Sequence, residues 1–287
     1  MPILAGTASE PLAQKIAEIL HEPLLTRTTK RFPDTEFYIR IHDDITNEHI
    51  IIVQTTYPDP NLVELFIMQN AVHEAGGKKI TVVIPYFGYN RQDKKFEPGE
   101  PISAQALAQL ISINASTIIT VDPHKDHLLQ FFTVPAYGCS AVAEIATYLK
   151  KKDIDFILAP DKGAKNRAEY AAKIIGCDYD YIEKTRIDGT TVTMKPKHLD
   201  AKGKNVAIID DIISTGGTMA QSIRELKRQK ANRVTVACTH GLFIGDAQQK
   251  LTTAGCDEII ATDTIQSNYS TVSVAPCIAE LLKKQIM

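Results

Sequence analysis

Short runs of apolar, mostly β-branched residues recur along the chain, and a stretch with apolar residues at helical spacing follows most of them. The runs are apolar at nearly every position, which is typical of strands covered on both faces within a parallel sheet. The pattern predicts strands over residues 49–57, 79–86, 116–124, 155–163, 205–212, 233–241 and 257–265. It predicts helices over residues 61–75, 103–114, 167–176 and 219–229.

The regular alternation of strands and helices indicates an α/β fold with right-handed crossover connections. Because these units are too many for one compact sheet of usual size, we expect two α/β domains of similar build, each a mainly parallel sheet flanked by helices. The first domain is expected over residues 1–142 and the second over residues 143–274. A last helix is expected over residues 275–287, where it could return to the first domain.

The bulk composition agrees with this fold and narrows the function. The chain has 287 residues, of which 44% are hydrophobic and 23% are charged, and its formal net charge is -2. This balance is normal for a globular protein and argues against a dedicated nucleic-acid-binding protein. The five cysteines form no C-x-x-C pair, no apolar run is long enough to span a membrane, and we expect no leader peptide. We therefore expect a cytoplasmic protein with reduced thiols and no membrane partner.

Three of the predicted strands end in aspartate, at Asp122, at Asp161 and at the pair Asp210–Asp211. In open parallel sheets, ligands bind at the carboxyl ends of the strands. A single aspartate at such a position often serves only as a turn former. Acidic ends on three strands of one chain instead indicate a site for metal-bound phosphates or sugar hydroxyls.

The segment after the Asp210–Asp211 pair has the composition of a phosphate-binding loop. Residues 214–218 are Ser-Thr-Gly-Gly-Thr and lead into a predicted helix. The two glycines allow backbone N–H groups to converge on one anion. The three hydroxyls add hydrogen-bond donors, and the helix N-terminus adds partial positive charge. Because the preceding carboxylates can accept hydrogen bonds from a vicinal diol, the segment predicts a site for a ribose 5-phosphate group.

The chain contains neither a G-x-x-x-x-G-K-[ST] motif nor a G-x-G-x-x-G motif, which argues against a P-loop kinase. Residues 206–218 instead resemble the ribose-phosphate loop shared by phosphoribosyltransferases and phosphoribosyl diphosphate synthetases. Further segments extend a resemblance to the ribose-phosphate pyrophosphokinase family over essentially the whole chain, namely residues 31–41, 85–96, 122–132 and 159–168.

This resemblance implies two tandem domains of phosphoribosyltransferase-like fold in an enzyme that uses ATP, ribose 5-phosphate and Mg²⁺. The C1 hydroxyl of ribose 5-phosphate would attack the β-phosphorus of ATP, giving 5-phosphoribosyl 1-diphosphate and AMP for nucleotide biosynthesis. The resemblance also implies a homo-oligomer, in which the loop of Asp34, Thr35 and Glu36 reaches the ATP site of a neighbouring subunit.

The matching positions imply a role for each candidate site residue. Lys184 and Arg186 would be catalytic, and Arg186 would also contact ribose 5-phosphate. The positions that would bind ATP are Asp34, Thr35, Glu36, Arg91 and Gln92. The other positions that would bind ribose 5-phosphate are Asp210, Asp211, Ser214, Thr215, Gly216, Gly217 and Thr218. The positions that would bind Mg²⁺ are His124 and Asp161.

Two of these positions are unusual on chemical grounds. The family commonly has glycine where this chain has Thr35. A β-branched residue tolerates a positive φ badly, so we expect either an ordinary β backbone at Thr35 or a reshaped loop. Imidazole is a poor ligand for a hard cation, so the metal role of His124 comes from the resemblance alone, whereas Asp161 suits oxygen coordination unaided.

Lys184 and Arg186 alternate along a predicted extended stretch before Gly189, so both side chains are expected to point to the same side. Two cations on one face could close over a polyphosphate, and the alternative is an exposed strand face with ordinary charges.

Two other functions are compatible with the ribose-phosphate loop. One is a phosphoribosyltransferase, which would consume phosphoribosyl diphosphate together with a nitrogenous base. The other is a regulator that kept the fold and lost the chemistry. ATP-dependent release of AMP would exclude the first as the main activity. The retained Lys184, Arg186, His124 and Asp161 argue against the second.

Overall fold

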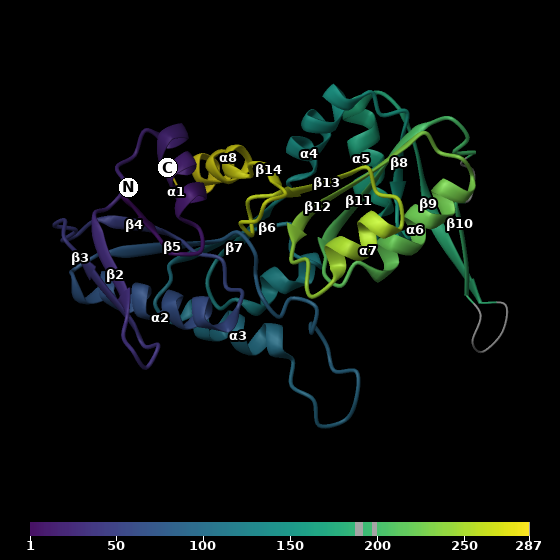
Figure 1. Cartoon of the computed structure of the whole chain (residues 1–287). Coiled ribbons are helices and arrows are strands. Elements are labelled where there is room, and N and C mark those ends of the chain that lie inside the picture. Colours follow the sequence, from purple (N-terminus) through teal and green to yellow (C-terminus); the bar gives the residue numbers. More distant parts are fainter. Residues whose placement is uncertain (187–191, 197–199, 287) are drawn as a thin grey trace. The chain divides into compact units, whose positions relative to one another are not determined.

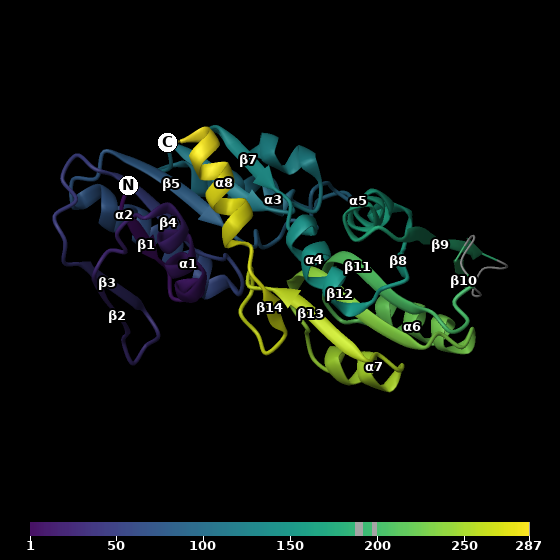
Figure 2. The same ribbon diagram turned by 90° about the horizontal axis from the view of Figure 1, so that it is seen from above.

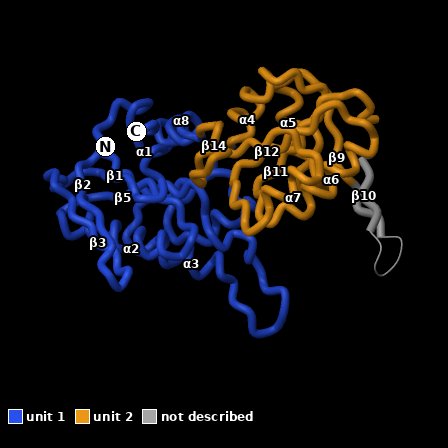
Figure 3. The backbone as a smooth tube through the Cα atoms, in the orientation of Figure 1, with its two compact units in different colours: residues 1–140, 274–287 blue, residues 141–273 orange. Residues whose placement is uncertain are grey.

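The computed structural model describes residues 1–186, 192–196 and 200–286. The chain forms two compact units (Figure 3), which are described separately: unit 1 consists of residues 1–140 and 274–287, and unit 2 of residues 141–273. Each unit contains a parallel or mainly parallel sheet flanked by helices, which confirms the predicted α/β fold class. No helix among the described residues is long and apolar enough to cross a membrane.

Unit 1 is built on a five-stranded sheet in which all neighbouring strands are parallel. The spatial order is β1 (Ile3–Ala5), β4 (His49–Val53), β5 (Lys79–Ile84), β6 (Thr117–Val121) and β7 (Ala136–Cys139). Residues 50–53 of β4, an inner strand of the sheet, are fully buried. This burial is the reason why the strand is apolar throughout, since helices cover both faces of the sheet.

Two pairs of helices cover these faces (Figures 1 and 2). One face packs against α2 (Asp59–Glu74) and α3 (Ser103–Ser112). Ile50 and Ile52, which point to this side, share a core with Leu65 of α2 and Ala108 of α3. The other face packs against α1 (Glu10–Leu20) and the C-terminal helix α8 (Ala275–Gln285). Helix α8 contacts α1, β6 and β7, so the end of the chain belongs to the fold of unit 1.

Unit 1 also carries a separate two-stranded hairpin, which is absent from the predicted strands. β2 (Arg27–Arg31) pairs antiparallel with β3 (Phe37–Ile41). Alternate residues of β3, namely Phe37, Ile39 and Ile41, pack against the core, and β3 contacts α2. The turn between the two strands carries Asp34, Thr35 and Glu36.

Unit 2 contains a seven-stranded sheet in which only the edge pair β9–β10 is antiparallel among the described pairs. The spatial order is β10 (Val192–Pro196), β9 (Asp178–Arg186), β8 (Phe156–Ala159), β11 (Asn205–Ile213), β12 (Arg233–Gly241), β13 (Glu258–Thr262) and β14 (Ser270–Val272). Its helices are α4 (Val142–Leu149), α5 (Lys165–Ile175), α6 (Gly217–Arg228) and α7 (Ala247–Thr253). Helices α6 and α7 share a core with alternate residues of β8, β11 and β12, including Leu158, Ile208 and Val236.

All seven predicted strands and the predicted helices are present, with ends that differ by a few residues. The unpredicted elements are mostly short or weakly patterned, such as β1, β14 and α7. Three short 3₁₀ segments complete the described secondary structure: η1 (Asp126–Phe131), η2 (Lys150–Lys152) and η3 (Lys162–Ala164).

Candidate functional site

The connection from β11 to α6 has the backbone that its glycines predict. Gly216 has φ 73°, a left-handed conformation that favours glycine. A Cβ at Gly216 would also lie 3.3 Å from the backbone oxygen of Ala247. Both observations explain why this position has no side chain.

The neighbouring Gly217 begins α6, and a Cβ placed there would meet no heavy atom within 4 Å. No described side chain caps the N-terminus of α6. The first N–H groups of a helix lack partners within the helix and favour an anion. Thr215 and Thr218 are exposed beside them, and Ser214 is half-buried. The loop therefore combines backbone donors, hydroxyls and open space, which together suit a phosphate.

Strand β11 carries the two carboxylates that precede this loop. Asp211 is 9% exposed and Asp210 is half-buried. The Asp211 backbone N–H donates to Asp210 Oδ1 at 2.9 Å, and the Ile212 N–H donates to Asp211 Oδ1 at 2.9 Å. Burial, reinforced by the negative charge of Asp211, raises the pKa of Asp210 to about 8. These two adjacent carboxyl groups favour a ligand that brings hydroxyl donors.

The tip of the β2–β3 hairpin exposes Asp34, Thr35 and Glu36 to solvent. Thr35 has φ 75°, which excludes the ordinary β backbone that was one of the two expected alternatives. The turn is closed locally, because Thr35 N–H donates to the Phe32 carbonyl at 2.8 Å and Glu36 N–H donates to Asp34 Oδ1 at 3.1 Å. Thr35 thus adopts the backbone of a glycine at the cost of local strain.

A buried carboxylate beneath the hairpin supports this turn. The Glu64 side chain of α2 is fully buried and accepts hydrogen bonds from the backbone N–H and the hydroxyl of Thr7, both at 2.7 Å. Arg31 Nη2 lies 3.5 Å from Glu64 Oε2, and Arg31 Nη1 donates to the Thr35 carbonyl at 3.1 Å. One arginine therefore links the buried Glu64 to the strained Thr35. Glu64 is not among the predicted site residues, because nothing in the sequence around it distinguishes it from a surface residue of a helix.

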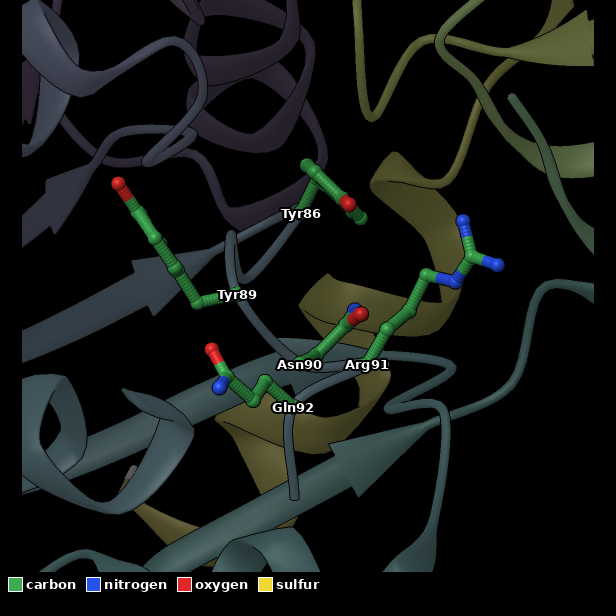
Figure 4. Close-up of a pocket in the computed structure, with 5 residues that line it drawn as sticks. All are labelled: Tyr86, Tyr89, Asn90, Arg91 and Gln92. Atoms are coloured by element: carbon green, nitrogen blue, oxygen red, sulfur yellow. The ribbon is translucent and has the colours of Figure 1, made fainter. Parts of the chain in front are cut away.

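The loop after β5 is fixed to the end of β4. Thr56 Oγ1 accepts a hydrogen bond from the Gly88 N–H at 2.8 Å, and the Tyr86 N–H donates to Thr55 Oγ1 at 3.2 Å. Tyr89 has φ 63°, and the Gln92 N–H donates to its carbonyl at 3.0 Å, which closes a turn. This turn borders a cavity of about 320 Å³ (Figure 4), which is lined by Tyr86, Tyr89, Asn90, Arg91 and Gln92.

The two predicted ATP-binding residues of this loop differ in their surroundings. Arg91 is exposed, and its guanidinium extends away from the loop backbone (Figure 4). Gln92 is half-buried, and its Oε1 accepts a hydrogen bond from the Ser103 hydroxyl at 2.6 Å at the start of α3. Arg91 is thus placed to meet a ligand, whereas the Gln92 amide already helps to attach the loop to α3. Asn90, Tyr86 and Tyr89 line the cavity but were not among the predicted site residues.

The two predicted metal ligands belong to different units. His124 follows β6 in unit 1 and is half-buried. Asp161 follows β8 in unit 2, and its Oδ1 accepts hydrogen bonds from the Gly163 N–H at 2.8 Å and the Ala164 N–H at 3.2 Å. The described residues contain no group of three or more His, Cys, Asp or Glu side chains that could hold a metal ion. The Asp161 carboxylate offers the oxygen donor that Mg²⁺ prefers, whereas the His124 imidazole is a poorer ligand for this ion.

The backbones of Lys184 and Arg186 lie in β9, where they pair with Met194 and Val192 of β10. The predicted extended conformation is therefore confirmed for this part of the segment. Gly189, which follows the predicted extended stretch, lies outside the described residues.

Two sequence profiles of known families match the chain. One, described as the N-terminal domain of ribose phosphate pyrophosphokinase, matches residues 1–114. The other, described as a phosphoribosyl transferase domain, matches residues 139–274.

Curated relatives match over nearly the full length. The chain is 41% identical over 283 residues to the ribose-phosphate pyrophosphokinase of Methanothermobacter thermautotrophicus, which covers 98% of this chain and 99% of that protein. It is 44% identical over 287 residues to the enzyme of the same name from Methanosarcina acetivorans. This alignment covers 99% of this chain and 100% of that protein. The crystal structure of phosphoribosylpyrophosphate synthetase from Mycobacterium smegmatis superposes with a TM-score of 0.84 at 30% identity, covering 98% of this chain and 97% of that one.

Proposed function

This chain belongs to the ribose-phosphate pyrophosphokinase family, and we propose that unit 1 supplies the nucleotide-binding loops and unit 2 the sugar-phosphate site of the family's reaction. The enzyme transfers the β,γ-diphosphoryl group of ATP to the C1 hydroxyl of ribose 5-phosphate. The products are 5-phosphoribosyl 1-diphosphate and AMP, and the reaction serves nucleotide biosynthesis.

The β11–α6 connection carries this proposal. Backbone N–H groups of residues 214–218 and the N-terminus of α6 would hold the 5-phosphate. Ser214, Thr215 and Thr218 would add hydroxyl donors. Asp210 and Asp211 would accept hydrogen bonds from the ribose hydroxyls. These hydrogen bonds would offset the unfavourable interaction between the two carboxyl groups.

ATP would bind on the loops of unit 1. Arg91 would meet the nucleotide from the β5 loop, with Gln92 beside it. The exposed carboxylates of Asp34 and Glu36, held apart by the turn at Thr35, would serve the nucleotide site of a neighbouring subunit in a homo-oligomer. Such sharing accounts for a polar turn that extends into solvent at the tip of a hairpin.

Magnesium would be held by His124 and Asp161 together with phosphate oxygens of the substrates. When bound, the ion supplies charge that offsets the negative charge of the polyphosphate. Lys184 and Arg186 would interact with the charge that develops on the transferred group, since phosphoryl transfer depends mainly on positioning and charge stabilisation. The five free cysteines agree with a reducing compartment, and we propose a cytoplasmic location.

A product assay tests the proposal. Purified protein is mixed with ATP, ribose 5-phosphate and Mg²⁺, and AMP and phosphoribosyl diphosphate are quantified. We expect both products in equal amounts, dependent on metal and sugar. ADP in place of AMP would indicate an ordinary kinase. Absence of nucleotide turnover would favour a phosphoribosyltransferase or a regulator, which consumption of phosphoribosyl diphosphate with added bases would separate.

The Lys184→Ala variant tests whether Lys184 takes part in catalysis. We expect kcat to fall about 100-fold, as when one charge-stabilising donor is lost, with nearly unchanged affinity for ribose 5-phosphate. A large rise in KM at normal kcat would assign Lys184 to substrate binding instead.

A further inference from the structure

Asn90, in the loop after β5, carries a buried side-chain amide. Its side chain belongs to a residue that is only 1% exposed, and neither Oδ1 nor Nδ2 has a partner within the part of the chain that the structure describes. Burying an amide without hydrogen bonds is unfavourable, and the large majority of buried polar side-chain atoms in folded proteins are paired. A residue that leaves both its donor and its acceptor unpaired therefore requires an explanation.

The backbone around Asn90 is held in place by several contacts. Tyr89 on one side has φ 63°, and the Gln92 N–H donates across the turn to the Tyr89 carbonyl at 3.0 Å. The Tyr89 hydroxyl donates to Asp59 at 2.9 Å, and the Gly88 N–H donates to Thr56 Oγ1 at 2.8 Å. Because the turn is fixed from both sides, Asn90 cannot satisfy its amide by a simple local shift of the backbone.

The amide faces the cavity of about 320 Å³ that the β5 loop borders. Figure 4 shows it directed toward the space between Tyr86 and Arg91. Ligand cavities range from about 300 to about 1,000 Å³, so this one has room for a ring system but not for a whole nucleoside triphosphate. Two tyrosines, two amides and one guanidinium form its lining, a combination that suits a flat heterocycle with polar edges.

We propose that Asn90 binds the base of the nucleotide, a contact that rests on the proposed function of the β5 loop. Oδ1 accepts a hydrogen bond from the exocyclic amino group of adenine, and Nδ2 donates to the adjacent ring nitrogen. This arrangement pairs both atoms that are unpaired in the free protein. Asn90 would then bind the base, and the neighbouring Arg91 would contact the same nucleotide.

The first test exploits the unpaired amide itself. Asn90→Leu removes both unpaired polar atoms and keeps a similar shape, so the free protein should melt about 2–4 °C higher. The same variant should raise the KM for ATP about tenfold or more and leave the KM for ribose 5-phosphate unchanged. A lower melting temperature would mean that Asn90 is satisfied inside the fold, for example by an internal water, and would overturn the proposal.

Thr235→Val is the matched control. Thr235 is fully buried in β12, and its Oγ1 is also unpaired among the described residues, but it does not line the cavity. This variant should likewise raise the melting temperature while leaving the kinetics with ATP unchanged. A loss of ATP affinity in both variants would show that the effect is general and would count against a contact at Asn90.

The second test changes the hydrogen-bonding pattern without changing shape. Asn90→Asp leaves two acceptors, which match the paired donors of guanine but not the ring nitrogen of adenine. The ratio of kcat/KM for ATP to that for GTP should fall about tenfold or more relative to the unsubstituted protein. An unchanged ratio would contradict a base contact.

Arg91→Ala separates a failure of this inference from a failure of the proposed function. If Arg91→Ala weakens ATP binding while both Asn90 variants leave it unchanged, Asn90 does not bind the base and the nucleotide loop stands. If none of the three variants affects ATP, the β5 loop is not the nucleotide site.

Discussion

The two units each bury carboxylates near their proposed ligand loops, but they surround these groups differently. Glu64 in unit 1 is matched by the N–H and hydroxyl of Thr7 and by the Arg31 guanidinium. Asp210 in unit 2 lies against Asp211, a group of the same charge, and its pKa is raised to about 8. A buried carboxylate with a full set of donors stabilises the fold, whereas a buried pair of like charges is unfavourable until a ligand supplies donors.

Glu64→Gln is expected to have the largest effect on stability. The neutral amide keeps one acceptor oxygen but presents N–H groups to at least one of the donors that now face the carboxylate. Since hydrogen bonds to charged groups contribute about 1.5–3 kcal/mol, we expect the free energy of unfolding to fall by about 2–3 kcal/mol in urea titrations. Glu74→Gln, at an exposed position of the same helix, is the control and should have little effect.

If Glu64→Gln and Glu74→Gln were equally mild, Glu64 would not be the support that its contacts indicate. The buried carboxylate of unit 1 would then not differ from that of unit 2 in its contribution to stability.

Asp210→Asn should act in the opposite direction on stability and reduce sugar binding. Above about pH 8, where Asp210 is ionised, removing its charge relieves the repulsion with Asp211, so the free protein should gain about 1 kcal/mol. Affinity for ribose 5-phosphate should fall about tenfold, because an amide accepts fewer hydrogen bonds from the ribose hydroxyls. The KM for ATP should stay nearly unchanged. Asp246→Asn, which affects only a surface ion pair with Lys250, is the control for unit 2.

An equal loss of affinity for ATP and for ribose 5-phosphate in Asp210→Asn would contradict the assignment of this carboxylate to the sugar. Unchanged affinity for both ligands would mean that Asp210 has a structural role and does not bind either ligand.

The pH dependence of stability offers a weaker but independent comparison. The pKa of Asp210 is raised in the folded state above its ordinary value of 3.8, so its stabilising contribution is complete below that value and is lost as the pH rises through about 8. Between about pH 5 and about pH 6, the ligand-free protein should therefore lose about 1–2 kcal/mol more than Asp210→Asn does. Urea titrations at both pH values measure this difference, and parallel slopes would argue against a raised pKa.

The same contrast explains what the sequence could and could not predict. The fully apolar runs identified the buried strands, because burial on both faces leaves a pattern along the chain itself. The glycines of residues 214–218 likewise indicated the phosphate loop, because a left-handed backbone restricts the residue type at Gly216. Glu64 and Asn90 left no such pattern, since their surroundings are made by residues distant in sequence, such as Thr7 for Glu64.

Thr35 shows the limit of residue preference as a guide. A β-branched residue disfavours a positive φ, yet Thr35 has φ 75° because contacts around it fix the turn. Arg31, which also lies beside the buried Glu64, donates to the Thr35 carbonyl at 3.1 Å. Tertiary contacts therefore override the local preference. The contacts of Arg31 with Glu64 and with the Thr35 carbonyl maintain the strained conformation.

Thr35→Gly is expected to have the smallest effect and to show whether that strain depends on Glu64. Glycine adopts the observed φ without strain but has greater freedom when unfolded, so the net gain in stability should be only about 0.5–1 kcal/mol. Asn47→Gly, at φ 64° in a residue that tolerates this conformation, should gain less. In the double variant Glu64→Gln/Thr35→Gly, the two effects should not add, because the weakened Arg31 contact already allows the turn to relax. Simple additivity in urea titrations would mean that the turn holds its conformation without Glu64, and that the buried carboxylate stabilises unit 1 without supporting the turn at Thr35.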